Sequence, residues 1–215
     1  MQKRGMIFDM DGTLWDSVEQ IVISWNQKLA QMGETHVNVS GERLTGLMGQ
    51  TMDAFARELF REEPLETAMK KLHILEVAEN DYLRTHGAVL LGDVRKVFEE
   101  LRTRGYGIYI VSNCQSGYIE AFLDHYKLWD LVDDLACFGD TKCGKAENLQ
   151  ALIRKHGLTH YWYLGDTRGD QEACEQAQVP FLFASYGFGE VQGEVMTLQR
   201  LEDLPKLLAC IDVHS

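Results

Sequence analysis

Short runs of apolar residues alternate with longer amphipathic stretches along most of the chain. This alternation is typical of strand–helix–strand units and predicts a parallel α/β sheet. The expected strands are the apolar runs at 5–9, 106–112, 135–138, 161–165 and 179–184, of which 135–138 is the weakest. Helices are expected between them near 94–104, 118–126, 145–156 and 171–178. We therefore expect a doubly wound parallel sheet.

The segment between the first two expected strands shows helical periodicity only. Ser17 and Gln20 form a capping-box pattern that opens a helix, and one face of this helix carries Ile21, Trp25, Leu29 and Met32. Further helical patterns cover 51–60 and 64–84. These patterns predict an all-helical domain inserted after the first strand.

The glycines on the return path help to place the boundaries of that insertion. Gly87 and Gly92 suit a linker that can act as a hinge. We expect the inserted cap to span residues 16–87 and the core domain to comprise residues 1–15 and 88–215.

Composition narrows the function classes. The net charge of -12 argues against nucleic-acid binding, which needs a basic face. No stretch approaches the roughly 18 apolar residues of a membrane span. The apolar run at the N-terminus is too short for a signal peptide. We therefore expect no membrane association and a cytoplasmic location. The five cysteines are never spaced as CxxC, which disfavours a zinc site or a disulfide framework.

The richest motif is DMDGTL at 9–14, directly after an apolar strand. Asp9 and Asp11 are two carboxylates that repel each other unless a cation or a proton lies between them. Gly12 allows the backbone to turn and to approach a ligand closely. Mg²⁺ prefers such oxygen ligands together with water and phosphate. A bare DxD would more often be an acidic surface turn, but DxDGT after a buried strand is far more specific.

A second acidic motif, GDTRGD at 165–170, follows another apolar strand. Asp166 stands at the strand end and Asp170 at the start of the next helix. Alone this pattern fits an N-capped helix. Because the ends of parallel strands converge on one crevice, the two acidic motifs together predict a metal site.

Two smaller signals occur elsewhere. Ser112 and Asn113 follow the strand at 106–112, a position where such residues usually serve a turn. Lys145 is the first residue of a predicted helix, where the helix dipole disfavours a cation. This position indicates that an anionic partner stabilises the lysine, although a solvated lysine is the commoner explanation for such a residue.

The order of these motifs is more informative than any one of them. DxDGT, Ser-Asn, lysine and GDxxxD each follow a strand or open a helix, in that order along the chain. In this combination the sequence resembles the haloacid-dehalogenase (HAD)-like hydrolases, particularly their phosphoglycolate-phosphatase-like branch with a helical cap. The resemblance covers nearly the whole chain. It implies a Rossmann-like core and Mg²⁺-dependent hydrolysis of a small phosphorylated metabolite.

The resemblance also implies catalytic and metal-binding roles. Asp9 would attack phosphorus, and Asp11 would protonate the leaving oxygen and then activate water. Mg²⁺ would be held by Asp9, the backbone carbonyl of Asp11, and Asp166, with Asp170 helping directly or through water. Family members that cleave carbon–halogen bonds lack the second acid, so Asp11 indicates a phosphatase.

Phosphate binding is implied for a second group of residues. Ser112 would bind phosphate, and Thr13 and Asn113 would add donors from their backbones. Lys145 would offset the charge of the transferred group. The lysine lacks the proline that commonly follows it in the family, and the nearby Lys142 is the alternative.

The cap is expected to decide the substrate, and its sequence says little. The stretch 44–52 aligns loosely with the family's specificity loop and places Gly49 and Gln50 toward the site, although a helix-capping role is the commoner explanation for Gln50. Trp15 could narrow the pocket or pack the hinge. Because no lysine or arginine lies in the stretch, a phosphosugar mutase is the weaker alternative, and a non-catalytic binding protein is weaker still. The substrate and the oligomeric state, monomer or dimer, stay open.

Overall fold

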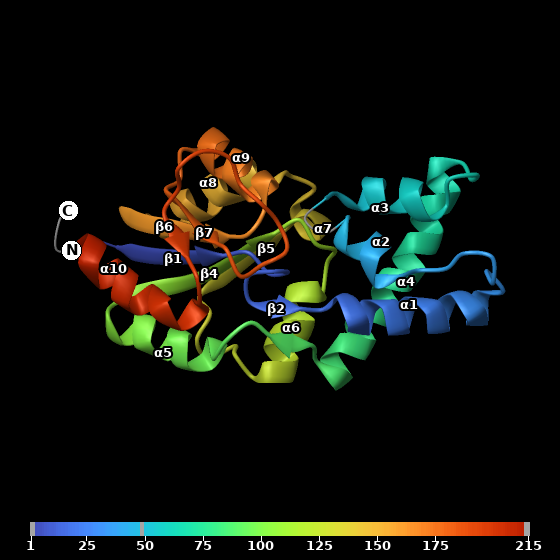
Figure 1. The fold of residues 1–215 in the computed structure, drawn as a ribbon, viewed down its shortest axis with the longest axis horizontal. Coiled ribbons are helices and arrows are strands. Elements are labelled where there is room, and N and C mark those ends of the chain that lie inside the picture. The colour runs from blue at the N-terminus through green and yellow to red at the C-terminus, as the bar shows by residue number, and fades with distance from the viewer. Residues whose placement is uncertain (1–2, 48–49, 213–215) are drawn as a thin grey trace.

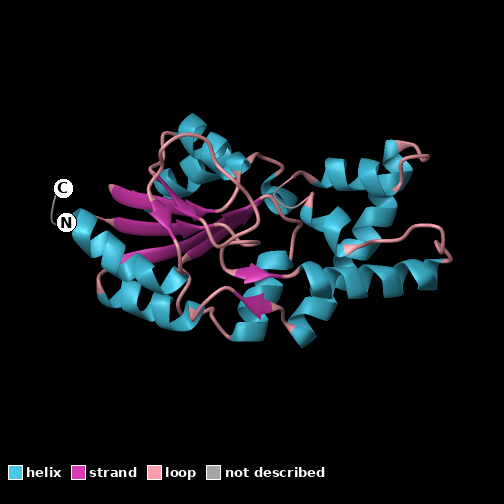
Figure 2. Cartoon of the chain, in the orientation of Figure 1, coloured by secondary structure: helices cyan, strands magenta, loops and turns pink. Residues whose placement is uncertain are grey.

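The architecture is a parallel α/β core with a helical region at one end (Figures 1 and 2). The structure is a computed structural model and describes residues 3–47 and 50–212. Its main sheet has six parallel strands in the order β5-β4-β1-β6-β7-β8. These strands are β1 (Arg4–Phe8), β4 (Tyr106–Ser112), β5 (Asp134–Cys137), β6 (His160–Gly165), β7 (Phe181–Ala184) and β8 (Thr197–Leu198).

The central strand β1 is buried on both faces. Helices α8 (Lys145–His156) and α9 (Arg168–Ala177) cover one face of the sheet, and α5 (Val94–Thr103) and α10 (Leu204–Asp212) cover the other (Figure 1). Ile7 packs into the apolar cluster of α8 and α9, whereas Met6 and Phe8 pack into the larger cluster that includes α5. A strand that is covered on both faces consists of a continuous run of apolar residues, and this run allowed β1 to be predicted from the sequence. The predicted doubly wound sheet is confirmed.

Among the described residues, four helices lie between β1 and α5. They are α1 (Val18–Met32), α2 (Gly41–Thr45), α3 (Met52–Leu59) and α4 (Leu65–His86), and α1 and α3 both pack against α4. On the predicted apolar face of α1, Ile21, Trp25 and Leu29 are buried and Met32 is half-buried. The predicted helical insertion is therefore present.

The capping-box interpretation at the start of α1 was wrong. Ser17 occupies the N-cap position, but its side chain makes no capping hydrogen bond. Its hydroxyl donates instead to Asp11 Oδ1 at 2.6 Å, and the Val18 N–H is satisfied by Asp16 Oδ1 at 3.0 Å. The Ser17 hydroxyl therefore binds a side chain of the core and does not cap the helix.

The short two-stranded ribbon at the junction was not predicted. Here β2 (Trp15–Asp16) pairs antiparallel with β3 (Val89–Leu90), so the chain leaves and re-enters the core side by side. Trp15 is fully buried there and makes edge-on contacts with the rings of Tyr118 and Phe122 in α6 (Tyr118–Tyr126). Trp15 therefore packs the junction. The division into residues 16–87 and the remainder stays a prediction.

Most predicted elements fall within a few residues of their observed bounds, and α6 and α8 match at both ends. Helix α9 begins at Arg168 and not at 171, because Thr167 and Asp170 form a reciprocal capping box. The sequence analysis missed α2, β8, α10, the short helix α7 (Phe138–Thr141) and the 3₁₀ turn η1 (Leu201–Asp203). Within the part of the chain that the structure describes, none of the helices has both the length and the apolar character to cross a membrane.

Candidate active site

The strand order brings the sequence motifs to one edge of the sheet. Strand β1 lies between β4 and β6 and runs parallel to both. Asp9 follows β1, Ser112 ends β4 and Asp166 follows β6, so the three side chains stand at the carboxyl ends of adjacent strands. This is the edge where doubly wound sheets bind their ligands.

Three carboxylates meet at this edge. Asp9, Asp166 and Asp170 are buried, and each offers a carboxylate oxygen within 4.8 Å of the others. Lys145, also buried, places its Nζ 2.9 Å from Asp9 Oδ1 and contacts Asp170 Oδ1 as well. Lys142 is exposed, and its ammonium donates to the carbonyl of Gly139. Lys145 is therefore the lysine that reaches the acidic cluster.

The cluster holds more negative charge than Lys145 can balance. Burial and the neighbouring carboxylate of Asp170 raise the pKa of Asp9 to about 7. Burial and the carboxylates of Asp9 and Asp170 raise the pKa of Asp166 to about 8. Such shifts are expected where carboxylates are crowded in a site with too little positive charge.

Asp170 and Lys145 are held in their charged forms by each other. Burial alone would raise the pKa of Asp170, but the ammonium of Lys145 outweighs it and lowers that pKa. Burial would likewise lower the pKa of Lys145, yet the carboxylates of Asp170 and Asp9 raise it well above its usual value. The pair is a buried ion bridge between α8 and α9.

The two oxygens of Asp170 are fully used by hydrogen bonds. Oδ1 accepts from Lys145 and from the hydroxyl of Tyr163 at 3.0 Å. Oδ2 accepts from the backbone N–H of Thr167 at 3.0 Å and from its hydroxyl at 2.7 Å. A carboxylate has about four acceptor positions, so Asp170 has none left for a metal ion.

Asp166 has acceptor capacity to spare. Its Oδ2 accepts from the N–H of Phe188 at 2.7 Å, and its Oδ1 lies 3.4 Å from the hydroxyl of Thr13. Gly12 passes so close, with a φ of +77°, that a Cβ atom there would stand 2.1 Å from Asp166 Oδ2. The glycine of DxDGT thus permits the DMDGTL turn to approach the second acidic motif.

Asp11 is not part of the acidic cluster and lines a cavity. Its Oδ1 accepts from the hydroxyl of Tyr118 at 2.6 Å and from that of Ser17 at 2.6 Å. Burial raises the pKa of Asp11 to about 6, and the two hydroxyl hydrogen bonds act in the opposite direction. A carboxyl group with a pKa in this range can exchange a proton near neutral pH.

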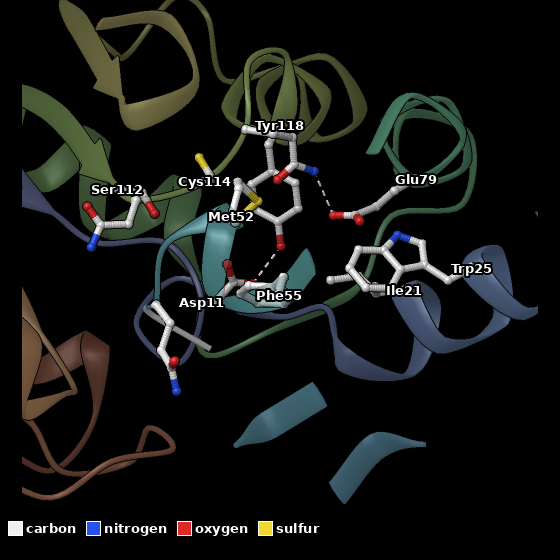
Figure 3. A pocket seen from close by; sticks show the side chains of 12 residues that line it. Asp11, Ile21, Trp25, Met52, Phe55, Glu79, Ser112, Cys114 and Tyr118 are labelled. Atoms are coloured by element: carbon white, nitrogen blue, oxygen red, sulfur yellow. Dashed lines mark hydrogen bonds between the residues drawn. The ribbon is translucent and has the colours of Figure 1, made fainter. Parts of the chain in front are cut away.

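The cavity lies between the core and the helical insertion (Figure 3). Its volume is about 40 Å³, room for roughly three water-sized groups. The core contributes Asp11, Ser112 and Tyr118, and the helices contribute mainly apolar side chains together with one acid, namely Trp25, Phe55 and Glu79.

The remaining predicted residues are placed as follows. Ser112 and Asn113 line the cavity, whereas Thr13 is buried beneath Asp166. Gln50 also lines the cavity, but it is exposed and its amide donates to the carbonyl of Gly46 at 2.9 Å. Gly49, predicted to face the site, lies outside the described residues.

The sequence analysis missed four side chains of the site, because each makes its contact through the fold. Ser17 and Tyr118 hold Asp11, Tyr163 holds Asp170, and Glu79 reaches the cavity from α4. A glutamate among apolar helix positions was the one available signal for Glu79, and Tyr163 lies within the apolar run at 161–165, where a tyrosine usually serves packing.

The sequence is similar to known proteins over most of its length. The family model described as haloacid dehalogenase-like hydrolase matches residues 6–184. A phosphoglycolate phosphatase from Aquifex aeolicus is 27% identical over 213 residues, covering 95% of this chain and 96% of the relative.

Solved structures show the same fold. A haloacid dehalogenase-like family hydrolase from Streptococcus pneumoniae superposes with a TM-score of 0.75 at 19% identity, covering 95% of this chain and 98% of that one. A β-phosphoglucomutase from Clostridium difficile also gives 0.75, at 12% identity and 99% coverage of both chains. At these identities the likeness concerns the fold alone.

Proposed function

Because this chain belongs to the haloacid dehalogenase-like hydrolase family, we propose that it hydrolyses a small phosphomonoester with Mg²⁺ through a phospho-aspartate on Asp9. The observation that supports this proposal best is that two aspartates of one motif, Asp9 and Asp11, lie in different environments. Asp9 stands beside Lys145 in a buried acidic cluster, and Asp11 faces a cavity two residues further on. The name of the Aquifex aeolicus relative agrees with a phosphatase.

The acidic cluster fits a magnesium ion. Its donors are carboxylate oxygens, which Mg²⁺ prefers, and the raised pKa values of Asp9 and Asp166 reflect negative charge that a divalent cation would neutralise. Asp9, Asp166 and the backbone carbonyl of Asp11 would hold the ion. Asp170 would support the site by holding Lys145, because its acceptor positions are taken by protein donors and none is left for the ion or for a bridging water. The bound ion would supply charge neutralisation for the phosphoryl oxygens.

The first step forms a bond between an Asp9 carboxylate oxygen and phosphorus, and the bond between phosphorus and the ester oxygen breaks. Asp11 protonates that ester oxygen, so the leaving group departs as an alcohol. Lys145 orients the Asp9 carboxylate and offsets negative charge near it.

The second step returns the enzyme to its starting state. Asp11, now a carboxylate, removes a proton from water, and the water oxygen attacks phosphorus. The bond from phosphorus to Asp9 breaks and inorganic phosphate leaves.

Ser112 and Asn113 would contribute donors to the phosphate. Thr13, also expected to do so, is engaged within the protein, because its N–H donates to the carbonyl of Met10 at 3.2 Å and its hydroxyl is directed at Asp166.

A mutase is less well supported. Such an enzyme must hold a second phosphate in the cap, and the described cavity lining includes no lysine or arginine. Arg43 of α2 is already paired with Glu58, at 3.2 Å from Nε to Oε1.

Release of inorganic phosphate from a panel of phosphomonoesters, with Mg²⁺ and with EDTA, tests the proposal. We expect magnesium-dependent turnover in the wild type and a loss of at least about a thousandfold in Asp9→Asn. Asp53→Asn, which alters an exposed aspartate on α3, is the matched control and should keep full activity. Turnover that survives in Asp9→Asn would rule out Asp9 as the nucleophile.

A further inference from the structure

Gln115 stands between two hollows of the molecule. The first is the cavity beside Asp11, with a volume of about 40 Å³. The second, here called the outer groove, lies between α4 and α7 and has a volume of about 390 Å³. Among the described residues, Met52 and Gln115 are the two that line both hollows. These two side chains therefore form the wall between the cavity and the outer groove.

Hydrogen bonds fix the orientation of Gln115 in this wall. Its Nε2 donates to Glu79 Oε1 at 2.9 Å, drawn as the dashed line to Glu79 in Figure 3, and to Asn80 Oδ1 at 3.2 Å. Asn80 in turn donates from its Nδ2 to the carbonyl of Ser116 at 2.8 Å. Glu79, Asn80 and Gln115 are all buried, so water does not compete for these bonds. Gln115 is therefore anchored by two residues of α4.

The anchor does not depend on the charge of Glu79. Burial raises the pKa of Glu79 to about 8, while the hydrogen bonds from Gln115 and from the Trp25 indole act in the opposite direction. An amide N–H can donate to a carboxylate oxygen and equally to the carbonyl oxygen of a carboxylic acid. Figure 3 shows the nitrogen edge of the Trp25 ring facing the Glu79 carboxyl group. Glu79 is thus engaged within the protein, and its role here is to hold Gln115.

The backbone beside Gln115 is tightly enclosed. Gly117 has a φ of +86°, and a Cβ atom there would stand 2.8 Å from Asn80 Nδ2. On the other side, a Cβ atom at Gly139 of α7 would stand 2.0 Å from the backbone nitrogen of Ser116. The loop that carries Gln115 therefore cannot shift toward α4 or α7 to widen the cavity.

The wall has a direct consequence for the leaving group. Asp11, which would protonate the ester oxygen, lines the cavity, so the leaving group must begin there. The cavity has room for roughly three water-sized groups. The outer groove beyond the wall offers apolar surface from Met69, Val77 and Phe138. A longer leaving group could reach that surface only if the wall were open.

We propose that Gln115 limits the size of the leaving group by closing the catalytic cavity toward the outer groove. The inference rests on the proposed function and restricts its substrate class to phosphomonoesters with a short leaving group. Met52, the first residue of α3, completes the wall with a flexible thioether side chain. Gln115 is the member of the wall that hydrogen bonds hold in place.

Two alkylphosphonates test the size limit in the wild-type enzyme. Ethylphosphonate and hexylphosphonate share one head group and differ only in chain length. Their inhibition constants are measured with Mg²⁺ against the phosphomonoester of the panel that the wild type hydrolyses fastest. We expect hexylphosphonate to bind at least about tenfold more weakly than ethylphosphonate, because its chain meets the wall. A smaller difference, or tighter binding of the hexyl compound, would overturn the inference.

Variants assign the limit to the wall. Gln115→Ala should shift the ratio of the two inhibition constants toward hexylphosphonate by at least about tenfold, because the chain can then bury methylene groups in the outer groove. Gln27→Ala makes the same change at an exposed position of α1, outside both hollows, and should leave the ratio unchanged. An unchanged ratio in Gln115→Ala, with a melting temperature near that of the wild type, would overturn the role of Gln115.

Met52→Ala opens the same wall from α3 and leaves the hydrogen bonds of Gln115 in place. If Gln115→Ala does not fold, this variant decides the question. A shift of the ratio toward hexylphosphonate would support the wall, and an unchanged ratio would overturn it.

Failure of the inference and failure of the proposed function give different results. If no ester of the panel is hydrolysed, or if hydrolysis persists in Asp9→Asn, the proposed function is wrong and the inference falls with it. If hydrolysis depends on Asp9 but hexylphosphonate inhibits the wild type as well as ethylphosphonate does, the proposed function stands and the inference alone is wrong.

Discussion

Lys145 lies 2.9 Å from Asp9 across 136 positions of the sequence, with its Nζ against the Oδ1 of the aspartate that follows β1. The same ammonium contacts Asp170, so one buried cation links the strand end to the start of α9. Lys145 is the first residue of α8, where the helix dipole disfavours positive charge. Lys145 is stable in this position because its attraction to two carboxylates outweighs its unfavourable interaction with the helix dipole.

Removal of this cation should affect both activity and stability. In Lys145→Met, Asp9 and Asp170 would be left buried without their counter-charge, a change that typically costs about 3–5 kcal/mol. We expect kcat/KM to fall by at least about a hundredfold, because Asp9 loses the group that orients it. Lys142→Met is the control, since Lys142 is exposed and reaches only a backbone carbonyl. Equal effects of the two substitutions on kcat/KM would show that Lys145 has no special role.

The hydroxyl of Tyr118 should tune the acid function of Asp11. Its hydrogen bond of 2.6 Å stabilises the Asp11 carboxylate and lowers the pKa of that group. If Asp11 must be protonated for the first step, kcat/KM falls as the pH rises through the pKa of Asp11. Tyr118→Phe removes the hydrogen bond, so this pKa should rise and the basic limb of the profile should move to higher pH, by about one unit.

Another tyrosine on the same helix provides the control for that measurement. Tyr126 donates its hydroxyl to the carbonyl of Ala88 and makes no contact with Asp11 among the hydrogen bonds of the described residues. The pH profile of Tyr126→Phe should therefore match that of the wild type. If the basic limb stays in place in Tyr118→Phe, the group that controls it is not Asp11.

The parts of the site that the sequence predicted are those that follow directly from strand ends. Asp9 and Asp166 each come immediately after an apolar run, so parallel pairing was enough to bring them together. Lys145 was identified by its unfavourable place at a helix start, and the structure supplies its partners. Local pattern and sheet topology sufficed for this half of the site.

The other half depends on contacts between elements that are far apart in the sequence. Tyr118 reaches Asp11 across 107 positions, and Glu79 meets Gln115 across 36. No periodicity encodes such contacts: the first requires α6 to lie beside the loop that follows β1, and the second requires α4 to pack beside α6. The two-residue strands β2 and β3 escaped detection for a related reason, since a pair of residues cannot display a period.

Trp15 should be important for stability and not only for the junction's shape. It is fully buried and packs edge-on against Tyr118 and Phe122. Trp15→Ala should lower the free energy of unfolding by about 3–5 kcal/mol, measured by urea denaturation. Trp129→Ala, at a position that is 49% exposed, should change it by only about 0.5 kcal/mol. A small effect at Trp15 would mean that the junction can repack around the missing ring.

Magnesium should stabilise the protein more strongly as the pH rises. In the metal-free protein the pKa values of Asp9 and Asp166 are raised to about 7 and about 8, chiefly by burial. The folded state then binds protons more tightly than the unfolded state, so these two groups make the metal-free protein less stable as the pH rises toward 8. Mg²⁺ needs the ionised carboxylates and must compete with protons at low pH.

The melting temperature measured with and without one fixed Mg²⁺ concentration therefore tests the acidic cluster as a metal site. The increase caused by Mg²⁺ should be small near about pH 5.5 and should grow toward about pH 8, as protons leave the ligands. Asp166→Asn removes a proposed ligand and should abolish most of the increase at the higher pH, whereas Asp53→Asn on the surface of α3 should retain it. An increase that is equal at both pH values, or that persists in Asp166→Asn, would place the bound ion elsewhere on this acidic protein.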